Sequence, residues 1–290
     1  MQILPFDDRD GFIWFNGELV EWRNANIHIL NHGLHYASCV FEGLRIYDGM
    51  IFKLYEHIER LFNSAKILDL DIPFDFQEVI DITNDIIIKQ NISNGYVRPI
   101  VWRGSEMMAI SAKKGSTNLA IAAWEWPSYF SPEKLLEGIK LDVSRWLRPS
   151  PESAPTDSKA AGLYMICSLS KHKAEKLGFD DALMLDYRGY IAEATGANIF
   201  FVKENELFTP KADCFLNGIT RQTVIEIAKE NKIKVHEKHF KLDFLKNCDE
   251  VFLTGTAVEI TPVSHIKDFN FKDRKLTKFL ISEFKKKVTP

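Results

Sequence analysis

The sequence predicts two domains of mixed α/β and α+β structure, and three observations support this prediction. The chain has 290 residues, which is at the upper end for one domain and ordinary for two. Residues 125–132 hold two prolines and no regular periodicity, as is typical of a linker. Strand and helix patterns do not alternate regularly enough for a doubly wound sheet.

The predicted N-terminal domain covers residues 1–124. Two β-hairpins are expected, 11–15 with 18–22 and 41–47 with 50–53, because Asn-Gly and Asp-Gly stand at their turns. Apolar residues recur at helical spacing over 54–68, which leaves His57, Arg60 and Ser64 on a neighbouring stripe. A second helix is expected over 76–90, and strands over 96–103 and 119–124 complete an α+β domain.

The predicted C-terminal domain covers residues 133–290. It begins with a strand over 139–146, a loop rich in proline and serine over 148–158, and a helix from about 159 to 177. A helix should begin near Thr220, and the basic run 285–287 closes a terminal helix whose cations face water. Further strands are expected at 182–186, 190–194, 199–203, 206–209, 250–255 and 259–263.

The composition narrows the class of protein. Hydrophobic residues make up 46%, charged residues 27%, and the net charge is -3, so we expect neither a nucleic-acid nor a membrane partner. Residues 1–11 are acidic and resemble no signal peptide, and no apolar run reaches the ~18 residues of a spanning helix. The four cysteines are far apart and form no CxxC pair, which favours a reducing cytoplasm.

Lys159 is the first candidate for chemistry. It lies between Ser158 and a run of small residues, Ala160-Ala161-Gly162, which would let a flat ligand approach. A partly desolvated lysine loses proton affinity, as an amine must before it attacks an aldehyde. The alternative interpretation is a lysine at a helix N-terminus in solvent.

Two segments could bind anions, and one acidic residue needs a partner. Gly218 and the possible N-cap Thr220 precede an apolar helix, so they form either a phosphate site or an ordinary capped helix. The small residues at 254–257 form either a second anion site or a plain turn. Glu193 lies on an apolar strand, where its partner could be a protonated pyridine nitrogen or an arginine.

Several familiar motifs are absent. The sequence contains no GxGxxG, Walker A, HExxH or GxSxG. His28, His32 and His35 cluster, but Gly33 interrupts any helix that would align them and no cysteine or carboxylate completes a shell. We therefore interpret them as packing histidines and expect no metal.

Taken together, the candidate segments resemble the branched-chain amino acid aminotransferases of the class IV (fold type IV) pyridoxal 5'-phosphate (PLP) family. The resemblance covers nearly the whole chain. It implies a fold type IV enzyme with the cofactor at the interface of two domains, the second being a barrel-like α/β domain that carries the PLP lysine. The matching segments are LHY at 34–36, FEGLR at 41–45, YVRP at 96–99, SK at 158–159, EATGAN at 193–198, GITR at 218–221 and GTAVEITP at 255–262.

The resemblance also implies how the cofactor is held. Lys159 would be the catalytic residue, forming a Schiff base with PLP and then moving a proton as base and acid. Glu193 would keep the pyridine nitrogen protonated, so that the ring accepts electrons, and Tyr164 would donate to the 3'-oxygen. The expected phosphate ligands are Arg60, Ile219, Thr220 and Thr256, and Gly218 would let the backbone come close to the cofactor.

The same resemblance implies a transamination between leucine, isoleucine or valine and 2-oxoglutarate. Thr256 and Ala257, supported by Tyr96, would bind the substrate α-carboxylate, and Arg98 would pair with the distal carboxylate of glutamate. An aromatic wall would enclose apolar side chains. Its members are Tyr36, Phe41, Trp126, Tyr129 and Tyr164.

Two departures and several alternatives accompany this interpretation. Residues 104–110 lack the glycine-rich character often found in the family, and Asn217 replaces a common proline. A D-amino acid transaminase or an aminodeoxychorismate lyase would share the same lysine, acid and phosphate loop. A non-catalytic phosphate-ligand binding protein is the alternative from another class. The family implies a homodimer or an assembly of dimers.

Overall fold

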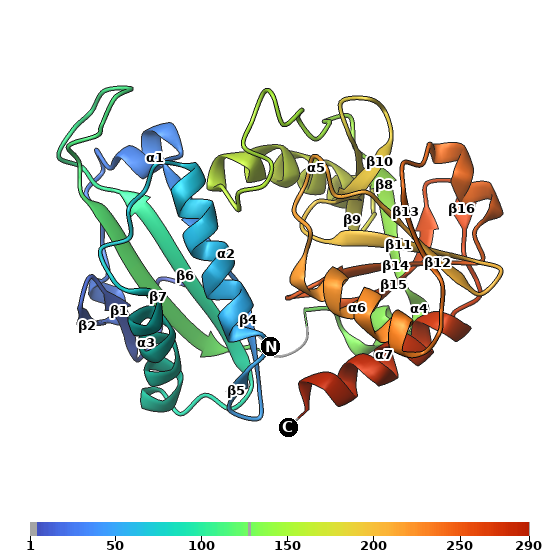
Figure 1. Cartoon of the computed structure of the whole chain (residues 1–290), viewed down its shortest axis with the longest axis horizontal. Helices are drawn as coiled ribbons and strands as arrows, with labels where there is room; N and C mark the ends of the chain where they lie inside the picture. The colour runs from blue at the N-terminus through green and yellow to red at the C-terminus, as the bar shows by residue number, and fades with distance from the viewer. Residues whose placement is uncertain (1–4, 127–128, 290) are drawn as a thin grey trace. The chain divides into compact units, whose positions relative to one another are not determined.

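The computed structural model describes residues 5–126 and 129–289, and its chain divides into two compact units (Figure 1). Unit 1 comprises Met1–Pro127 and Ser158–Gly162, and unit 2 comprises Ser128–Asp157 and Leu163–Pro290. The domain boundaries predicted from the sequence differ from these units, because the prediction placed residues 158–162 in the C-terminal domain. In the structure the Ser158 hydroxyl donates to the Ser64 carbonyl and Ala160 pairs with Val40, which attaches this segment to unit 1. The predicted linker includes residues 127 and 128, which lie outside the described part.

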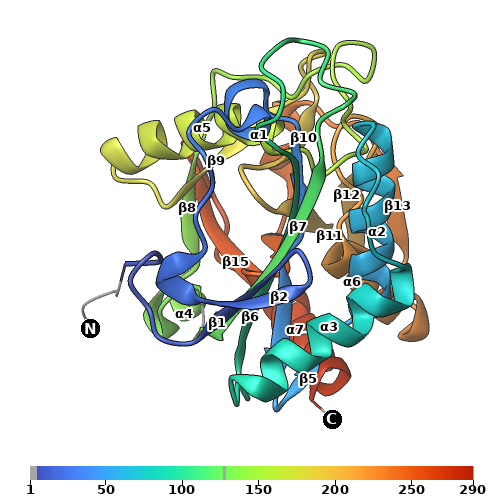
Figure 2. The same cartoon turned by 90° about the vertical axis from the view of Figure 1, so that its left-hand side faces the viewer.

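Unit 1 is built on a seven-stranded antiparallel sheet with the order β2-β1-β7-β6-β4-β5, and β3 pairs with β6. Its helices α2 and α3 cover one face of the sheet (Figures 1 and 2). The strands are β1 Phe12–Phe15, β2 Glu18–Glu21, β3 Cys39–Phe41, β4 Leu44–Tyr47, β5 Met50–Ile51, β6 Gly95–Arg103 and β7 Thr117–Glu125. The helices are η1 Trp22–Asn24, α1 His32–Tyr36, α2 Leu54–Ile67 and α3 Phe76–Lys89.

The turns of both predicted hairpins are confirmed. Asn16 and Gly17 have φ of 49° and 101°, and Asp48 and Gly49 have φ of 46° and 81°, as a two-residue turn between right-twisted strands requires. The predicted strand 41–47, however, is divided into β3 and β4 at Glu42 and Gly43. Since the Gly43 N–H donates to the Glu42 carboxylate, this break belongs to a polar site.

The core of unit 1 lies between its sheet and its two long helices. Ile58 and Leu61 of α2 pack with Val79 of α3 against alternate residues of the strands, such as Val97 and Val101. A capping box of Asp75 and Glu78 starts α3. Both helices therefore lie within about one residue of the ranges that periodicity predicts.

Unit 2 is built on a nine-stranded mixed sheet with the order β10-β9-β8-β15-β14-β11-β12-β13, and β16 pairs with β15. Strand β10 passes directly into β11, where the Ala194 N–H donates to the Ala197 carbonyl over 2.8 Å. This turn joins distant positions of the strand order, so the sheet curls as a barrel-like domain requires. The strands are β8 Ile139–Val143, β9 Asp181–Leu185, β10 Ile191–Ala194, β11 Asn198–Lys203, β12 Glu206–Pro210, β13 Val235–Lys238, β14 Glu250–Gly255, β15 Glu259–Ile266 and β16 Phe269–Asn270.

The helices of unit 2 lie against this sheet. α6 and α7 pack on each other and on β14, whereas α5 packs on β8 and β9 (Figure 1). They are α4 Pro132–Glu137, α5 Tyr164–Lys176, α6 Ile219–Glu230, η3 Leu242–Asn247 and α7 Lys275–Val288. The short helix η2 Ala161–Leu163 begins in unit 1 and ends at the first residue of the second segment of unit 2. The sequence did not predict α1, α4 or β13. No helix among the described residues is long and apolar enough to cross a bilayer.

Candidate active site

Lys159 lies in an extended segment that is fixed along its backbone. Its N–H donates to the Ser64 hydroxyl over 3.0 Å, and its carbonyl accepts from the Phe41 N–H over 3.3 Å. The predicted helix start at residue 159 is therefore wrong: a backbone committed to partners far away in the sequence cannot begin a helix, and α5 starts at Tyr164. The half-buried Lys159 side chain places Nζ 5.0 Å from the centroid of the Phe41 ring.

Arg60, a predicted phosphate ligand, lies on α2 one turn before Ser64. Its Nε and Nη2 donate to the two oxygens of Glu42 over 2.6 and 2.9 Å. His57 Nδ1 adds a hydrogen bond to the same carboxylate over 2.7 Å. Both Glu42 and His57 are buried, and the sequence identified neither as part of a site.

Four of the predicted substrate residues come together in unit 1. The Arg98 guanidinium lies 4.7 Å from the Phe41 ring centroid, and its Nη2 donates to the Tyr96 hydroxyl over 3.4 Å. The Tyr96 and Trp126 rings meet edge to face at 4.7 Å. Arg98 Nε is buried without a hydrogen-bond partner among the described residues, which suits a guanidinium that awaits an anion.

The close packing of this group explains one glycine. A Cβ at Gly43 would lie 1.7 Å from the Tyr96 hydroxyl, so only glycine lets this tyrosine approach the break between β3 and β4. Two other predicted wall residues, Tyr36 and Tyr129, are partly exposed and have other neighbours, and the fifth, Tyr164, begins α5 in unit 2. The Tyr36 ring lies 4.6 Å from the His32 ring in α1 in a tilted arrangement, and Tyr129 in unit 2 lies beside Phe130 and Lys171.

Glu193 occupies a buried position on β10 in unit 2. The strand register shifts between Ile191 and Glu193, and an irregularity of this kind can turn a side chain toward a site. Asn198 Nδ2 donates to Glu193 Oε2 over 3.2 Å, and Arg148 Nε lies 3.3 Å from Oε1. The arginine that the sequence analysis considered as a partner thus exists, and it is Arg148.

Arg148 interacts electrostatically with three groups of unit 2, which are Glu193, Cys167 and Tyr164. Burial alone would lower the pKa of its guanidinium, but Glu193, Cys167 and Tyr164 together raise it. Burial also raises the pKa of the Cys167 thiol to about 11, although the nearby Arg148 charge opposes this shift. The predicted cofactor residues Glu193 and Tyr164 therefore share one buried cation.

The predicted phosphate loop is the start of α6. Gly218, not the expected Thr220, is the N-cap residue, and as a glycine it has no side chain to cap the first N–H groups of Ile219 and Thr220. A helix start of this kind can bind an anion. A Cβ at Gly218 would lie 2.3 Å from Asn198 Oδ1, which accepts the Gly218 N–H over 3.1 Å.

The turn 254–257 lies next to this loop through Asn198. Asn198 is paired with Thr254 in the β11–β14 register, and Gly255 approaches Ala197. The Thr254 hydroxyl is buried and has no hydrogen-bond partner in the described residues. Thr256 and Ala257, predicted to bind phosphate and carboxylate, are half-buried in the same turn.

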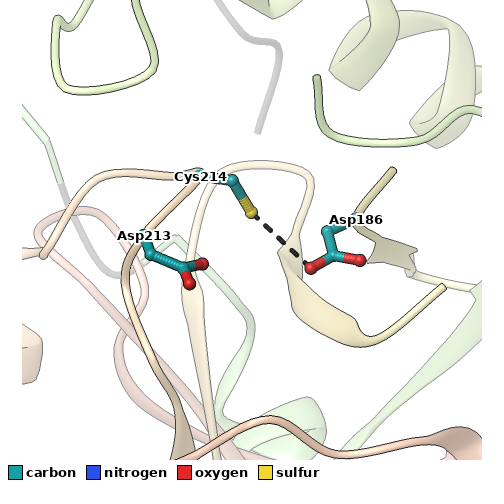
Figure 3. Close-up of side chains that lie close together, drawn as sticks. All are labelled: Asp186, Asp213 and Cys214. Atoms are coloured by element: carbon teal, nitrogen blue, oxygen red, sulfur yellow. Dashed lines mark hydrogen bonds between the residues drawn. The ribbon is translucent and has the colours of Figure 1, made fainter. Parts of the chain in front are cut away.

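Asp186, Asp213 and Cys214 lie close enough together to hold a metal ion, but their surroundings do not favour one. Cys214 points at the Asp186 carboxylate beside Asp213 (Figure 3), but Arg188 donates to both carboxylates over 2.7 Å. Burial, reinforced by Asp186, raises the pKa of the Cys214 thiol to about 12, which disfavours the thiolate that metals need.

The N-terminal histidines hydrogen-bond to groups of the protein itself. His32 contacts the Ser38 hydroxyl and the Ala109 carbonyl, and His35 contacts the Ile29 carbonyl, each over 2.9 Å. These contacts agree with their interpretation as packing residues.

The family model described as amino-transferase class IV matches residues 39–266, more than half of the chain, and the chain belongs to this family. It is therefore an aminotransferase. This confirms the family, the fold class and the type of reaction that the sequence predicted.

Within the family, the chain is similar to the branched-chain-amino-acid aminotransferases. The probable enzyme of Rickettsia felis is 46% identical over 289 residues, 98% of each chain. The crystal structure of the Escherichia coli enzyme has a TM-score of 0.93 at 38% identity, covering 97% of this chain and 95% of that one. The enzyme of Thermobaculum terrenum in its PLP form has a TM-score of 0.87 at 28% identity, covering 96% of this chain and 93% of that one.

Proposed function

We propose that this chain transfers the amino group between L-leucine, L-isoleucine or L-valine and 2-oxoglutarate, with PLP bound to Lys159. The observation that carries the proposal is that Lys159 is half-buried beside the Phe41 ring and that Ser64 fixes the Lys159 backbone. A fixed backbone limits where the amine can lie, and precise placement of reacting groups is a large part of catalysis. The relatives of 41–47% identity named for this activity support the substrate class.

The residues that surround these positions fit PLP. Gly218 packs against Asn198 Oδ1 where a side chain would not fit, it offers no side-chain cap to the first N–H groups of α6, and the buried Thr254 hydroxyl has no hydrogen-bond partner among the described residues. These are the donors that a phosphate needs. We assign the phosphate to Arg60, Ile219, Thr220 and Thr256, with Gly218 as the N-cap residue that precedes the first N–H groups of α6.

The remaining roles concern protons and orientation. PLP supplies an electron sink for the reaction. Glu193 would hold a proton on the pyridine nitrogen, Tyr164 would donate to the 3'-oxygen, and Lys159 Nζ would carry a proton to and from the substrate α-carbon. Lys159 is only half-buried, so substrate can reach it.

The substrate contacts follow from the group of side chains around Arg98. Its buried Nε would complete a pair with the distal carboxylate of glutamate. The α-carboxylate would lie at Thr256 and Ala257, supported by Tyr96. An apolar side chain would contact the aromatic wall, which comprises Tyr36, Phe41, Trp126, Tyr129 and Tyr164.

A second copy of the chain is the proposed partner, and a reducing cytoplasm is the proposed location. The sheet face opposite α2 and α3 borders an apolar hollow of about 410 Å³ lined by Leu34, Ile100 and Trp102, among others, and surfaces of this kind often mark protein contacts. Dimerisation predicts twice the chain mass in size-exclusion chromatography with light scattering. The four cysteines are free, as cytoplasmic thiols usually are.

An absorption spectrum of the purified protein tests cofactor and reaction together. L-leucine should bleach the visible band of the bound cofactor, and 2-oxoglutarate should restore it. Borohydride reduction and peptide mapping should find a pyridoxyl group on Lys159. Lys159→Ala should lose the band, whereas Lys203→Ala, at a partly exposed side chain, should keep it. A protein without the pyridoxyl group, or one that prefers D-alanine to L-leucine, would contradict the proposal.

A further inference from the structure

Glu42 is a buried carboxylate that the proposed function does not use. Its side chain is 0% exposed, yet it accepts hydrogen bonds from Arg60, from His57 Nδ1 and from the Gly43 N–H. Arg60 donates through Nε and Nη2 to the two carboxylate oxygens, and we call this bidentate pair the fork. A buried ion pair stabilises a fold little better than apolar packing does. The stability of unit 1 alone therefore gives a weak reason for this arrangement.

Another buried carboxylate in the same chain shows a purely structural arrangement. Glu250 accepts from the N–H groups of Leu276 and Thr277 and from the Thr277 hydroxyl, each over 2.7–2.8 Å. These donors are the first turn of α7, so Glu250 caps a helix. Glu42 instead receives most of its hydrogen bonds from two side chains of α2.

The charges of the Glu42 group are defined by their surroundings. Burial alone would raise the pKa of the Glu42 carboxyl, but the Arg60 charge and the His57 hydrogen bond hold it well below its usual range. Burial lowers the pKa of His57, and this effect exceeds the opposing one of Glu42. The group is therefore a carboxylate, a guanidinium and a neutral imidazole that donates from Nδ1.

The fork fixes one edge of the Arg60 guanidinium. An arginine carries five N–H donors, and this fork uses Nε and Nη2, so the edge that carries Nη1 has a defined direction. Four residues further along α2, Ser64 binds the backbone of Lys159. One helix face therefore holds both the guanidinium and the segment of the reactive amine.

We propose that Glu42 is a positioning residue that orients Arg60 toward the cofactor phosphate, and that His57 in turn holds Glu42. This inference rests on the proposed function, which assigns Arg60 to the phosphate. It predicts that phosphate binding depends on the direction of the guanidinium more than on net charge.

The substitution Glu42→Gln separates orientation from charge. It removes a negative charge next to Arg60, so Coulomb attraction alone predicts tighter binding of the phosphate. Loss of the fork predicts weaker binding, because a long arginine side chain would then have to be ordered by the ligand itself. The two effects have opposite signs, and the proposal requires the second to prevail.

The experiment compares the affinities of the full-length apoenzyme for PLP and for pyridoxal, which lacks the phosphate. Glu42→Gln should weaken PLP binding by about 10- to 100-fold, by analogy with the loss when the partner of a metal ligand is removed, and should leave pyridoxal binding nearly unchanged. In an Arg60→Ala background the same substitution should have little further effect, because the two residues act as a unit. Glu250→Gln is the matched control and should keep the wild-type ratio of the two affinities.

Each other outcome has a defined meaning. Tighter PLP binding, an equal loss for both ligands, or a full Glu42→Gln effect in the Arg60→Ala background would overturn the positioning role. If Arg60→Ala itself leaves the ratio unchanged, the assignment of Arg60 in the proposed function fails as well. Should Glu42→Gln yield no folded protein, Glu42→Asp decides, since it keeps the charge but shortens the fork and should weaken PLP binding selectively.

Discussion

The two units each bury a glutamate beside an arginine, but they hold it differently. In unit 1 the Arg60 fork reaches both oxygens of Glu42 over 2.6 and 2.9 Å. In unit 2 Arg148 Nε lies 3.3 Å from Glu193, and the Asn198 amide donates over 3.2 Å. A short bidentate pair fixes geometry strongly, whereas longer contacts leave a carboxylate more freedom to adjust to another donor.

This difference assigns different tasks to two residues of the same type. Glu42 would act on the cofactor through Arg60, while Glu193 would contact the pyridine nitrogen itself. Arg148, which Tyr164 and Cys167 also influence, supplies the positive charge beside Glu193. Substitutions at the two glutamates should therefore change different measurable quantities.

The largest effect is expected for Glu193→Gln. An amide cannot stabilise a protonated pyridine nitrogen as a carboxylate can, so kcat with L-leucine and 2-oxoglutarate should fall by about 10²- to 10³-fold, as when one preorganised electrostatic partner is lost. The ratio of PLP to pyridoxal affinity should stay at the wild-type value, in contrast to Glu42→Gln. Steady-state kinetics and cofactor titration measure the two quantities.

Glu250→Gln serves as the control for burial, because Glu250 is a buried carboxylate of the same unit that caps α7. It should lower stability and leave kcat near the wild-type value. A Glu193→Gln enzyme with normal kcat would end the comparison, since Glu193 would then be structural as well.

Local chemistry explains which parts of the fold the sequence could predict. The turns at Asn16-Gly17 and Asp48-Gly49 and the helices α2 and α3 follow from neighbouring residues, because turn geometry and apolar periodicity are local. The predicted start of a helix at Lys159 was wrong, because the hydrogen-bond partners of that backbone, Ser64 and Phe41, are distant in sequence.

The same argument applies to the site. The resemblance named Lys159 and Glu193. It did not identify Arg148 and Asn198 as the partners of Glu193, because a loop arginine and a strand amide leave no periodic signal in the sequence. Glu42 was hidden inside a predicted strand. Only the break between β3 and β4, which Gly43 and the Tyr96 hydroxyl require, reveals that this segment is polar, and such a contact is visible only in three dimensions.

A second prediction concerns the stability of unit 2. Arg148→Met would leave Glu193 buried without its cation, and removing one partner of a buried pair should lower the free energy of unfolding by about 3 kcal/mol. Urea denaturation of the full chain measures this loss. Lys286→Met provides the comparison, because its pair with Glu283 is exposed and should contribute almost nothing. Equal stabilities of the two variants would mean that Arg148 does not compensate Glu193.

The smallest expected effect is a change of pH dependence at His57. Its folded-state pKa is lowered by burial, while an unfolded histidine titrates near 6.5, so below about pH 6.5 the unfolded chain takes up a proton that the folded chain refuses. Stability should therefore decline as the pH falls through this range. His57→Asn keeps a donor near the position of Nδ1 but does not titrate. The slope of the unfolding free energy between about pH 5 and 6.5 should then be shallower by at most roughly 1.4 kcal/mol per pH unit, the value for one proton.

The range above neutral pH supplies the control for His57→Asn. Between about pH 7 and 8 the curves of the two proteins should run parallel, because histidine is neutral in both the folded and the unfolded state there. An unchanged slope below about pH 6.5 would show that His57 is not held neutral beside Glu42. His57 would then not support Glu42 as a neutral donor, and the contrast between the surroundings of Glu42 and Glu193 would rest on the Arg60 fork alone.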